Sequence, residues 1–363
     1  MSTLVPSHIE KLVPYVPGKP VEELERELGI KNAIKLASNE NPMGPSPLAL
    51  AAIAKHLPES HRYPDAATYK LREKLSHHHD VAMDEIIIGN GSNEIIDNLC
   101  RTFAGPNDHA VIGLPSFVCY RLGLIAADVP FTEVPLREHV AWDIEAMLAA
   151  VKPNTKIMFV AHPNNPTGAH VPGEALKRLV KDLPEHVLLV MDEAYVEFAE
   201  ATDFVSALEL RALRERLLIL RTFSKAYGLA AIRVGYGIGP RNVIDYLNRI
   251  RAPFNCNSLA QVAAIAALDD KAHVEKYVAM NRTERARVEP ALAAMGLTVA
   301  RSQANFVLVN FKRPGKEIYE RMLRQGVIVR PMPPPIDTWL RITFGLPAEN
   351  DRLLAAVQTV LGE

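Results

Sequence analysis

Two hydrophobic patterns alternate along residues 45–251. Short runs that are apolar at nearly every position recur, and they read EIIIGN (85–90), HAVIGL (109–114), PFTEVPL (130–136), TKIMFVA (155–161), HVLLVM (186–191), RLLILRT (216–222) and IRVGYGIG (232–239). Most are separated by segments with apolar residues at helical spacing, such as 93–104, 117–127 and 173–183. Fully apolar strands separated by helices are typical of a mainly parallel sheet covered by helices. The pattern therefore predicts an α/β fold.

This alternation ends at RAPFNCNS (251–258). Long helical periodicity follows over 260–296, then short strands at 305–311, 326–331 and 340–344, and a final helix over 349–363. The order predicts a smaller α+β domain. We expect a large domain over residues 45–255 and a small domain built from residues 1–44 and 256–363.

Composition excludes several classes of protein. The 363 residues are 48% hydrophobic, and 41 basic and 42 acidic side chains nearly cancel, so no broad cationic surface is expected for nucleic acid or a membrane. No apolar stretch approaches the roughly 20 residues that span a bilayer, and the first residues lack the apolar core of a secretory signal. Three cysteines without a C-x-x-C pair, and adjacent histidines at 77–79 that point in different directions, favour a cytoplasmic protein with no metal site.

Chemically useful side chains follow the apolar runs, where ligands bind in parallel sheets. Lys225 comes just after the run 216–222; in apolar surroundings its pKa would fall and it could form a Schiff base, although a lone lysine is more often a surface residue. Asp192 ends another run and would suit a protonated ring nitrogen, or equally cap a helix. Tyr195, three positions on, could donate to a phenolate oxygen.

Other strand ends carry weaker signals. Asn165 lies before a proline in HPNNPTG, so its amide can project from the loop, or the segment is a plain turn. Gly91, Ser92 and Asn93 lie between a strand and a helix, which is the geometry of an anion site or of a tight turn. Phe117 could stack on a flat ring or belong to the core.

The combination is more specific than its parts. It supplies an imine-forming lysine, an aspartate for a pyridinium, and a tyrosine and an asparagine for a phenolic oxygen. Ser224 and Arg233 could complete a phosphate cup with the glycine and serine of GNGS, since a guanidinium matches phosphate oxygens. These are the requirements of pyridoxal 5′-phosphate, an electron sink for carbanions.

The chain resembles the fold type I, pyridoxal-phosphate-dependent aminotransferases, and among them the histidinol-phosphate aminotransferases. The resemblance covers nearly the whole chain and rests on motifs that include LVPYVPGKP, KLASNENPMGPSP, RYPD, GNGSNEIID, PNNPTG, DEAYVEF, TFSKAYGLAAIRVGY, ANFVLV and GVIVRPM. It implies a large domain with a mainly parallel sheet plus a smaller α+β domain. It also implies these contacts for the cofactor: Lys225 in the imine, Asp192 on the ring nitrogen, Asn165 and Tyr195 on the phenolic oxygen, Phe117 on the ring face, and Ser92, Asn93, Ser224 and Arg233 on the phosphate.

The resemblance also implies a substrate and a partner subunit. Arg330 and Arg341 resemble the arginines that hold the anionic end of the substrate, Tyr15 a tyrosine that closes over it, and Tyr63 a residue that reaches the phosphate of the other subunit in a homodimer. Without the resemblance, Tyr63 would equally be a surface turn residue and the two arginines surface residues on strands. The expected reaction is amino transfer from L-histidinol phosphate to 2-oxoglutarate, giving imidazole acetol phosphate and L-glutamate, in histidine biosynthesis.

Two departures from the family pattern bear on the substrate more than on the cofactor. PMPPPIDTW lies between Arg330 and Arg341, where the family usually has a glycine- and tyrosine-containing turn, and its prolines could stiffen the substrate entrance. His162 stands where asparagine is common. An aromatic amino-acid aminotransferase, an amino-acid-phosphate decarboxylase and a cofactor-binding regulator therefore stay as alternative functions.

Overall fold

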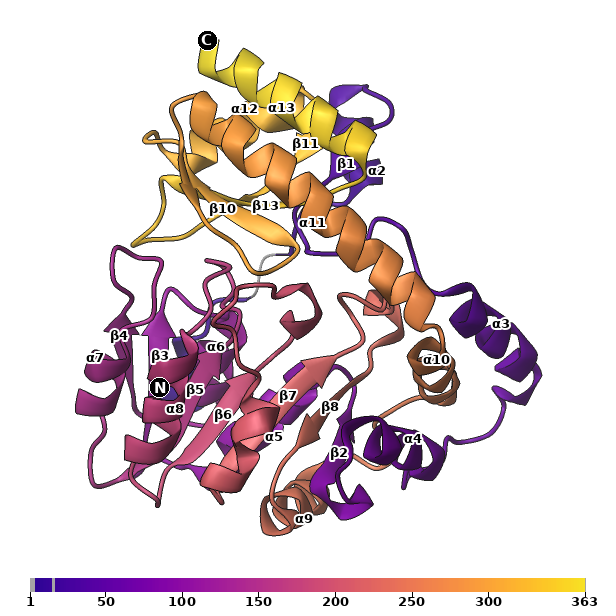
Figure 1. Cartoon of the computed structure of the whole chain (residues 1–363), viewed down its shortest axis with the longest axis vertical. Helices are drawn as coiled ribbons and strands as arrows, with labels where there is room; N and C mark the ends of the chain where they lie inside the picture. Colours follow the sequence, from indigo (N-terminus) through magenta and orange to yellow (C-terminus); the bar gives the residue numbers. More distant parts are fainter. Residues whose placement is uncertain (1–3, 15–16, 363) are drawn as a thin grey trace.

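The computed structural model describes residues 4–14 and 17–362. A seven-stranded sheet lies at the centre of its larger part (Figure 1). The strand order is β2-β8-β7-β6-β5-β3-β4. The bounds are β2 Ile86–Gly89, β3 His109–Leu114, β4 Phe131–Pro135, β5 Thr155–Ala161, β6 Leu188–Asp192, β7 Leu217–Thr222 and β8 Gly235–Ile238. Strands β4, β3, β5, β6 and β7 are parallel, and β8 runs antiparallel to both of its neighbours. The predicted α/β fold with a mainly parallel sheet is confirmed.

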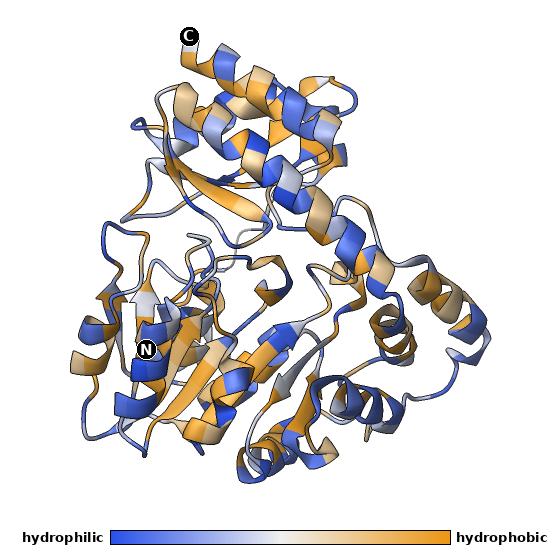
Figure 2. Ribbon diagram, viewed as in Figure 1, coloured by the Kyte–Doolittle hydropathy of each residue, from blue (hydrophilic) through white to orange (hydrophobic). Residues whose placement is uncertain are grey.

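Helices cover the central sheet because its strands are apolar on both faces, as Figure 2 shows for the strands between β3 and β7. The covering helices are α5 Ser92–Phe103, α6 Val118–Ala126, α7 Ile144–Ala149, α8 Gly173–Asp182 and α9 Arg241–Ile250. Helix α5 packs against α6 and α9, whereas α8 packs against α7. Short 3-10 segments complete the connections: η2 Met83–Glu85, η3 Val196–Phe198, η4 Ala207–Leu213 and η5 Ala230–Ile232.

A second, antiparallel sheet lies above the first in Figure 1. Its order is β12-β13-β10-β9, with β9 Thr298–Ala300, β10 Phe306–Asn310, β12 Arg330–Pro331 and β13 Trp339–Thr343. Strand β11 Val327–Ile328 pairs instead with β1 Ile34–Lys35, in parallel. The strand predicted over 326–331 is therefore two short strands, because its two halves pair with different partners. This pairing holds the N-terminal segment against the second sheet.

The remaining helices surround the second sheet or flank the first. Around the second sheet lie α2 Val21–Leu28, α11 Lys271–Ala294, α12 Gly315–Arg324 and α13 Pro347–Gly362 (Figure 1). At the other end of α11 are α3 Pro47–His56, η1 Leu57–Glu59, α4 Tyr69–His79 and α10 Ser258–Asp269, and the short α1 Ser7–Glu10 packs on α6. Helix α11 thus runs from the second sheet down to the helices beside the first.

The sequence of three adjacent histidines at 77–79 after a charged helix predicts a solvated helix end, but the structure shows that this end is only partly solvated. Although His77 and His78 are exposed, His79 Nε2 lies 2.8 Å from the Tyr236 hydroxyl, and burial lowers the pKa of His79 to about 3. Among the residues that the structure describes, no group of three or more potential ligands could hold a metal ion, and no helix is long and apolar enough to cross a membrane.

Candidate active site

A cavity of about 490 Å³ lies beyond the carboxyl ends of β5, β6 and β7. Its walls come from both sheets and from the N-terminal segment. The predicted site residues that line it are Ser92, Asn93, Phe117, Asn165, Asp192, Tyr195, Ser224, Lys225, Arg233, Arg330 and Arg341. The fold therefore gathers most of the predicted residues at the edge where parallel sheets bind ligands.

Three predicted residues are not among those that line this cavity. Gly91 lies just before Ser92 at the start of α5 but is not on the cavity wall. Tyr63 is 82% exposed and stacks on Phe254 with ring centroids 4.7 Å apart, and it is absent from the cavity wall of the same chain. Tyr15 lies outside the described residues, so its predicted contact with substrate has no structural counterpart here.

Lys225 projects from the segment that follows β7. Its Nζ donates to the backbone carbonyl of Ser38 at 3.3 Å and lies 5.9 Å from the centre of the Tyr195 ring. Burial, together with the nearby Arg341 guanidinium, lowers the pKa of Lys225 to about 8. A lysine with this pKa is neutral near physiological pH far more often than an exposed lysine, and only the neutral amine is nucleophilic.

Asp192 is the last residue of β6 and is 5% exposed. Its Oδ2 accepts from the Tyr120 hydroxyl at 2.7 Å, and its Oδ1 accepts from the backbone N–H of Ala194 at 3.1 Å. Burial raises the pKa of Asp192 to about 6, in spite of these two hydrogen bonds. A buried carboxyl of this kind gains strongly from a cation placed against it, as a protonated ring nitrogen would be.

Tyr195 presents its hydroxyl between two amides. The Nδ2 groups of Asn39 and Asn165 donate to the hydroxyl oxygen at 3.0 and 3.2 Å, so its own proton can be donated to a third atom. Burial raises the pKa of Tyr195 to about 12, which keeps that proton in place at neutral pH. The arrangement suits a ligand oxygen that carries negative charge.

Sequence analysis assigned no role to Asn39 or Tyr120. Asn39 is 1% exposed and is held by β13, because its N–H donates to Thr343 Oγ1 at 2.9 Å and its Oδ1 accepts from the same hydroxyl at 3.1 Å. Tyr120 is fully buried on α6, stacked against Phe159. The available signals were the polar run ASNEN for Asn39 and a tyrosine within an apolar helix for Tyr120.

A phosphate cup is formed at the start of α5. Arg233 Nη1 donates to Ser224 Oγ at 3.3 Å and to the carbonyl of Ala230 at 3.1 Å. A Cβ on Gly91 would lie 2.3 Å from Arg233 Nη2, and Gly91 has a φ of +76°. The guanidinium thus packs directly over the backbone that leads into Ser92, the first residue of α5.

The donors in this cup are those that a phosphate monoester requires. The N–H groups at the start of the 12-residue helix α5 receive no side-chain cap, and two hydroxyls, Ser92 and Ser224, lie beside Arg233 on the cavity wall. Together with Lys225, Asp192 and Tyr195, the set fits pyridoxal 5′-phosphate.

Two arginines face each other across the hairpin β12–β13. Arg330 and Arg341 are register partners, and both line the cavity. Arg341 donates to Asn165 Oδ1 at 2.7 Å and to the carbonyl of Ala37 at 2.6 Å. The hairpin thus places two guanidinium groups on one wall of the cavity, and a guanidinium matches the paired oxygens of a phosphate or carboxylate ligand.

Phe117 and His162 occupy supporting positions. Phe117 immediately precedes α6, lies half-buried on the cavity wall and meets the Tyr120 ring edge-to-face at 5.6 Å. The side chain of His162 is fully buried away from the cavity: its Nδ1 accepts from the N–H of Val171 and its Nε2 donates to the carbonyl of Val205, both at 3.0 Å. The departure at 162 therefore supports the loop that carries Asn165.

The proline-rich connection between the two arginines folds as a closed turn. The N–H of Met332 donates to the carbonyl of Trp339 at 3.1 Å, and Ile336 and Trp339 pack with Val140 from the first sheet's side of the cavity. None of the described residues 331–340 belongs to the cavity wall. The effect of the prolines on the substrate entrance stays a prediction.

The sequence model for class I and II aminotransferases matches residues 31–357, and the chain belongs to this family. Among its most similar relatives, the histidinol-phosphate aminotransferase of Anaeromyxobacter sp. (strain Fw109-5) is 45% identical over 361 residues, which cover 99% of each chain. Histidinol-phosphate aminotransferase 2 of Pseudomonas aeruginosa is 46% identical over 358 residues, which cover 97% of this chain and 96% of the relative.

Solved structures agree with this assignment. Histidinol-phosphate aminotransferase from Sinorhizobium meliloti, in complex with pyridoxal-5′-phosphate, has a TM-score of 0.91 and 29% identity, and the match covers 100% of this chain and 98% of that one. The predicted fold class and the predicted aminotransferase family are confirmed. The roles of individual site residues stay predictions.

Proposed function

We propose that this protein transfers the amino group of L-histidinol phosphate to 2-oxoglutarate, with pyridoxal 5′-phosphate as cofactor. The observation that carries the proposal is the pair Arg330 and Arg341, which face each other on the wall of a cavity that also holds Lys225, a lysine whose pKa burial lowers to about 8. Curated relatives at 41–46% identity over nearly the whole chain carry the name histidinol-phosphate aminotransferase and support this substrate.

Bound pyridoxal phosphate supplies an aldehyde for the amine and a ring that accepts electrons from the substrate Cα. Lys225 Nζ would bind the aldehyde carbon. Once the substrate amine displaces it, the freed Lys225 amine would take the proton from the substrate Cα and deliver it to the former aldehyde carbon of the cofactor, as net amino transfer requires. Asp192 holds the ring nitrogen protonated, and Tyr120 keeps that carboxylate oriented. Tyr195 and Asn165 hold the phenolic oxygen, while Ser92, Asn93, Ser224 and Arg233 hold the phosphate.

The two arginines serve both half-reactions. A phosphate ester and a dicarboxylate are both anions with paired oxygens, which a guanidinium binds as a planar fork. Arg341 also donates to Asn165, and the Asn165 amide donates to the Tyr195 hydroxyl. Binding of the anion by Arg341 would therefore affect the position of Asn165 and, through it, of Tyr195. The same contacts would orient the substrate amine toward Lys225.

We also infer a homodimer in the cytoplasm, built from protomers with a large domain at 45–255 and a small domain from 1–44 and 256–363. Tyr63, exposed and stacked on Phe254, supports the dimer, because a tyrosine held away from its own cavity is available to a neighbouring subunit. In such a dimer Tyr63 of one protomer would contribute to the phosphate cup of the other.

The test follows the visible absorbance of the purified, cofactor-loaded protein. L-histidinol phosphate alone should convert the band of the aldehyde form of the cofactor to that of its amine form, and 2-oxoglutarate should then restore it. Conversion by phenylalanine but not by histidinol phosphate would instead indicate an aromatic aminotransferase. Release of carbon dioxide without any need for 2-oxoglutarate would indicate a decarboxylase.

A further inference from the structure

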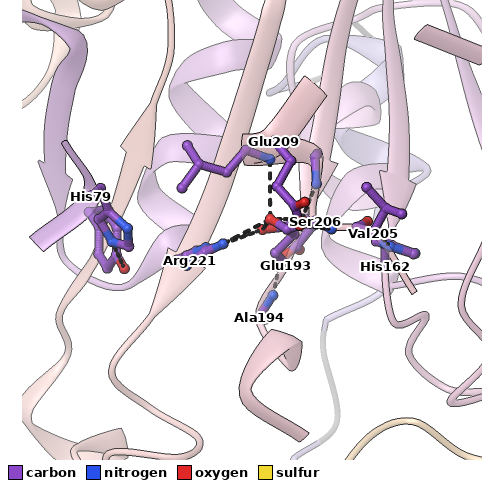
Figure 3. A network of polar contacts seen from close by, with 12 residues as sticks. His79, His162, Glu193, Ala194, Val205, Ser206, Glu209 and Arg221 are labelled. Carbon is purple, nitrogen blue, oxygen red and sulfur yellow. Dashed lines mark hydrogen bonds and ion pairs between the residues drawn. The ribbon is translucent and has the colours of Figure 1, made fainter. Parts of the chain in front are cut away.

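Glu193 and Arg221 form a buried ion pair, which Figure 3 shows, and neither residue lines the cavity. Glu193, the next residue, is fully buried, and its Oε2 accepts from Arg221 Nε at 3.1 Å and Nη2 at 2.7 Å. Arg221 belongs to β7, and its side chain is 12% exposed. The pair therefore joins the segment after β6 to the strand that leads toward Lys225.

Ser206 and the start of η4 complete the coordination of Glu193. Ser206 Oγ lies 2.9 and 3.0 Å from the two carboxylate oxygens and accepts from Arg221 at 3.0 Å, and the N–H of Ala207 donates to Oε1 at 2.6 Å. Both oxygens of Glu193 are thus satisfied by donors. A buried pair with all its hydrogen bonds made is costly to break from either side.

Backbone hydrogen bonds also join the end of β6 to the ends of the neighbouring strands β5 and β7. The N–H of Glu193 donates to the carbonyl of Leu220 at 2.9 Å, and the N–H of His162 donates to the carbonyl of Asp192 at 2.8 Å. The ends of β5, β6 and β7 are thereby fixed at the level of Asp192. Asp192 and Lys225 project from this edge into one cavity.

Glu193 is one of several titratable groups that surround Asp192 and affect its pKa. The groups that face Asp192 are Tyr120 and Cys119 from α6, Tyr195 after β6, Lys225 after β7, and Glu193 beside it. Around Glu193 lie Arg221 from β7, His162 at the end of β5 and Glu197 in η3. Burial has the largest effect on the pKa of Asp192, Glu193 raises it further, and Lys225 opposes this increase.

We propose that Glu193 and Arg221 are positioning residues: their buried ion pair fixes the strand ends that carry Asp192 and Lys225 and sets the charge next to the Asp192 carboxyl. The inference rests on the proposed function, since it assumes that Asp192 pairs with the cofactor's ring nitrogen. The pair touches neither cavity nor cofactor, so it acts only through Asp192 and the strand ends.

The test measures the affinity of the apoprotein for pyridoxamine 5′-phosphate by calorimetry between pH 4.5 and 8. This probe has no aldehyde, so imine formation with Lys225 does not enter, and the titrations of the probe itself are the same for every variant. Wild-type affinity should fall as Asp192 becomes protonated. Glu193→Gln keeps the shape but removes the charge, so its midpoint should move to lower pH by about 0.5 unit or more.

Two further variants test whether the shift of the midpoint comes from the charge of Glu193. Glu193→Gln/Arg221→Met buries no unpaired charge and should fold, with a midpoint between those of the wild type and the single variant. Glu200→Gln is the matched control, because it breaks the pairs of Glu200 with Arg282 and Arg285, which lie off the cavity wall. It should cost stability without moving the midpoint.

The outcomes separate this inference from the proposed function. A midpoint in Glu193→Gln that stays in place or rises, or an equal shift in Glu200→Gln, would overturn the positioning role while leaving the aminotransferase intact. A wild-type protein that does not bind the probe at any pH would overturn the cofactor assignment, and this inference with it.

Discussion

Lys225 is the residue on which the proposed chemistry depends. Lys225→Ala should lower kcat by about 10²- to 10⁴-fold or more, because it removes the group that moves the proton at the substrate Cα. The phosphate cup is unchanged, so the variant should still bind the cofactor. Steady-state kinetics with histidinol phosphate, beside calorimetry with pyridoxal phosphate, checks both points. Lys181→Ala, a change of an exposed lysine on α8, should match the wild type.

His162 should make the fold sensitive to acid. Burial lowers its pKa from 6.5 to about 4, so the unfolded chain binds a proton that the folded chain excludes. The stabilising effect is present above about pH 6.5 and disappears as the pH falls toward 4. This linkage is worth about 3 kcal/mol over that interval.

The comparison that isolates this effect uses His162→Gln, which retains an acceptor and a donor. Its unfolding free energy in urea should fall less than that of the wild type between pH 6.5 and 4. His186→Gln, at an exposed position, should follow the wild type. Parallel pH curves for His162→Gln and the wild type would contradict the prediction.

At the scale of elements, the start of α5 depends on a glycine. Gly91→Ala places a Cβ against Arg233 at a positive φ, so we expect at least about a tenfold loss of cofactor affinity together with about 1 kcal/mol of stability. Gly296→Ala is the control: Gly296 has a φ of +82° but nothing within 4 Å of its added Cβ. It should lose similar stability and no affinity, as calorimetry and thermal unfolding would show.

The hairpin β12–β13 is expected to bind the substrate through Arg330. Arg330→Met removes one of the two guanidinium groups that this hairpin places on the cavity wall. KM for histidinol phosphate should rise about 10- to 100-fold, because a charge-assisted hydrogen bond to the anion is lost. A variant with unchanged KM would remove Arg330 from the substrate site.

Local sequence patterns predicted the elements that carry most of the site. Lys225, Asp192 and Asn165 follow buried strands, and a parallel sheet brings such strand ends together whatever the details of packing. The role of Tyr120 depends on how α6 packs so that the Tyr120 hydroxyl reaches Asp192, and that of Glu193 on a loop folded back to bring Ser206 to it. Both contacts arise only from tertiary packing, so no local hydrophobic pattern in the sequence predicts them.

For the whole molecule, the proposed homodimer makes a quantitative prediction about the activity of dimers that combine two different variants. Tyr63→Ala and Lys225→Ala should each be impaired as homodimers. After unfolding and refolding together, half of the dimers are mixed, and each mixed dimer has one site with both residues intact, so about a quarter of wild-type activity should return. No recovery, with mixed dimers verified by mass, would place Tyr63 outside the partner's site.

The hydrogen bonds between Asn39 and Thr343 join residues that are 304 positions apart. Asn39 supports Tyr195, and Arg341 lies two positions before Thr343, so both walls of the cavity depend on the last strand of the chain. A polypeptide emerging from the ribosome therefore cannot assemble the site until almost its whole length has been synthesised. Prematurely terminated products should be unable to retain the vitamin-derived cofactor, so they would not withdraw it from the cell's supply.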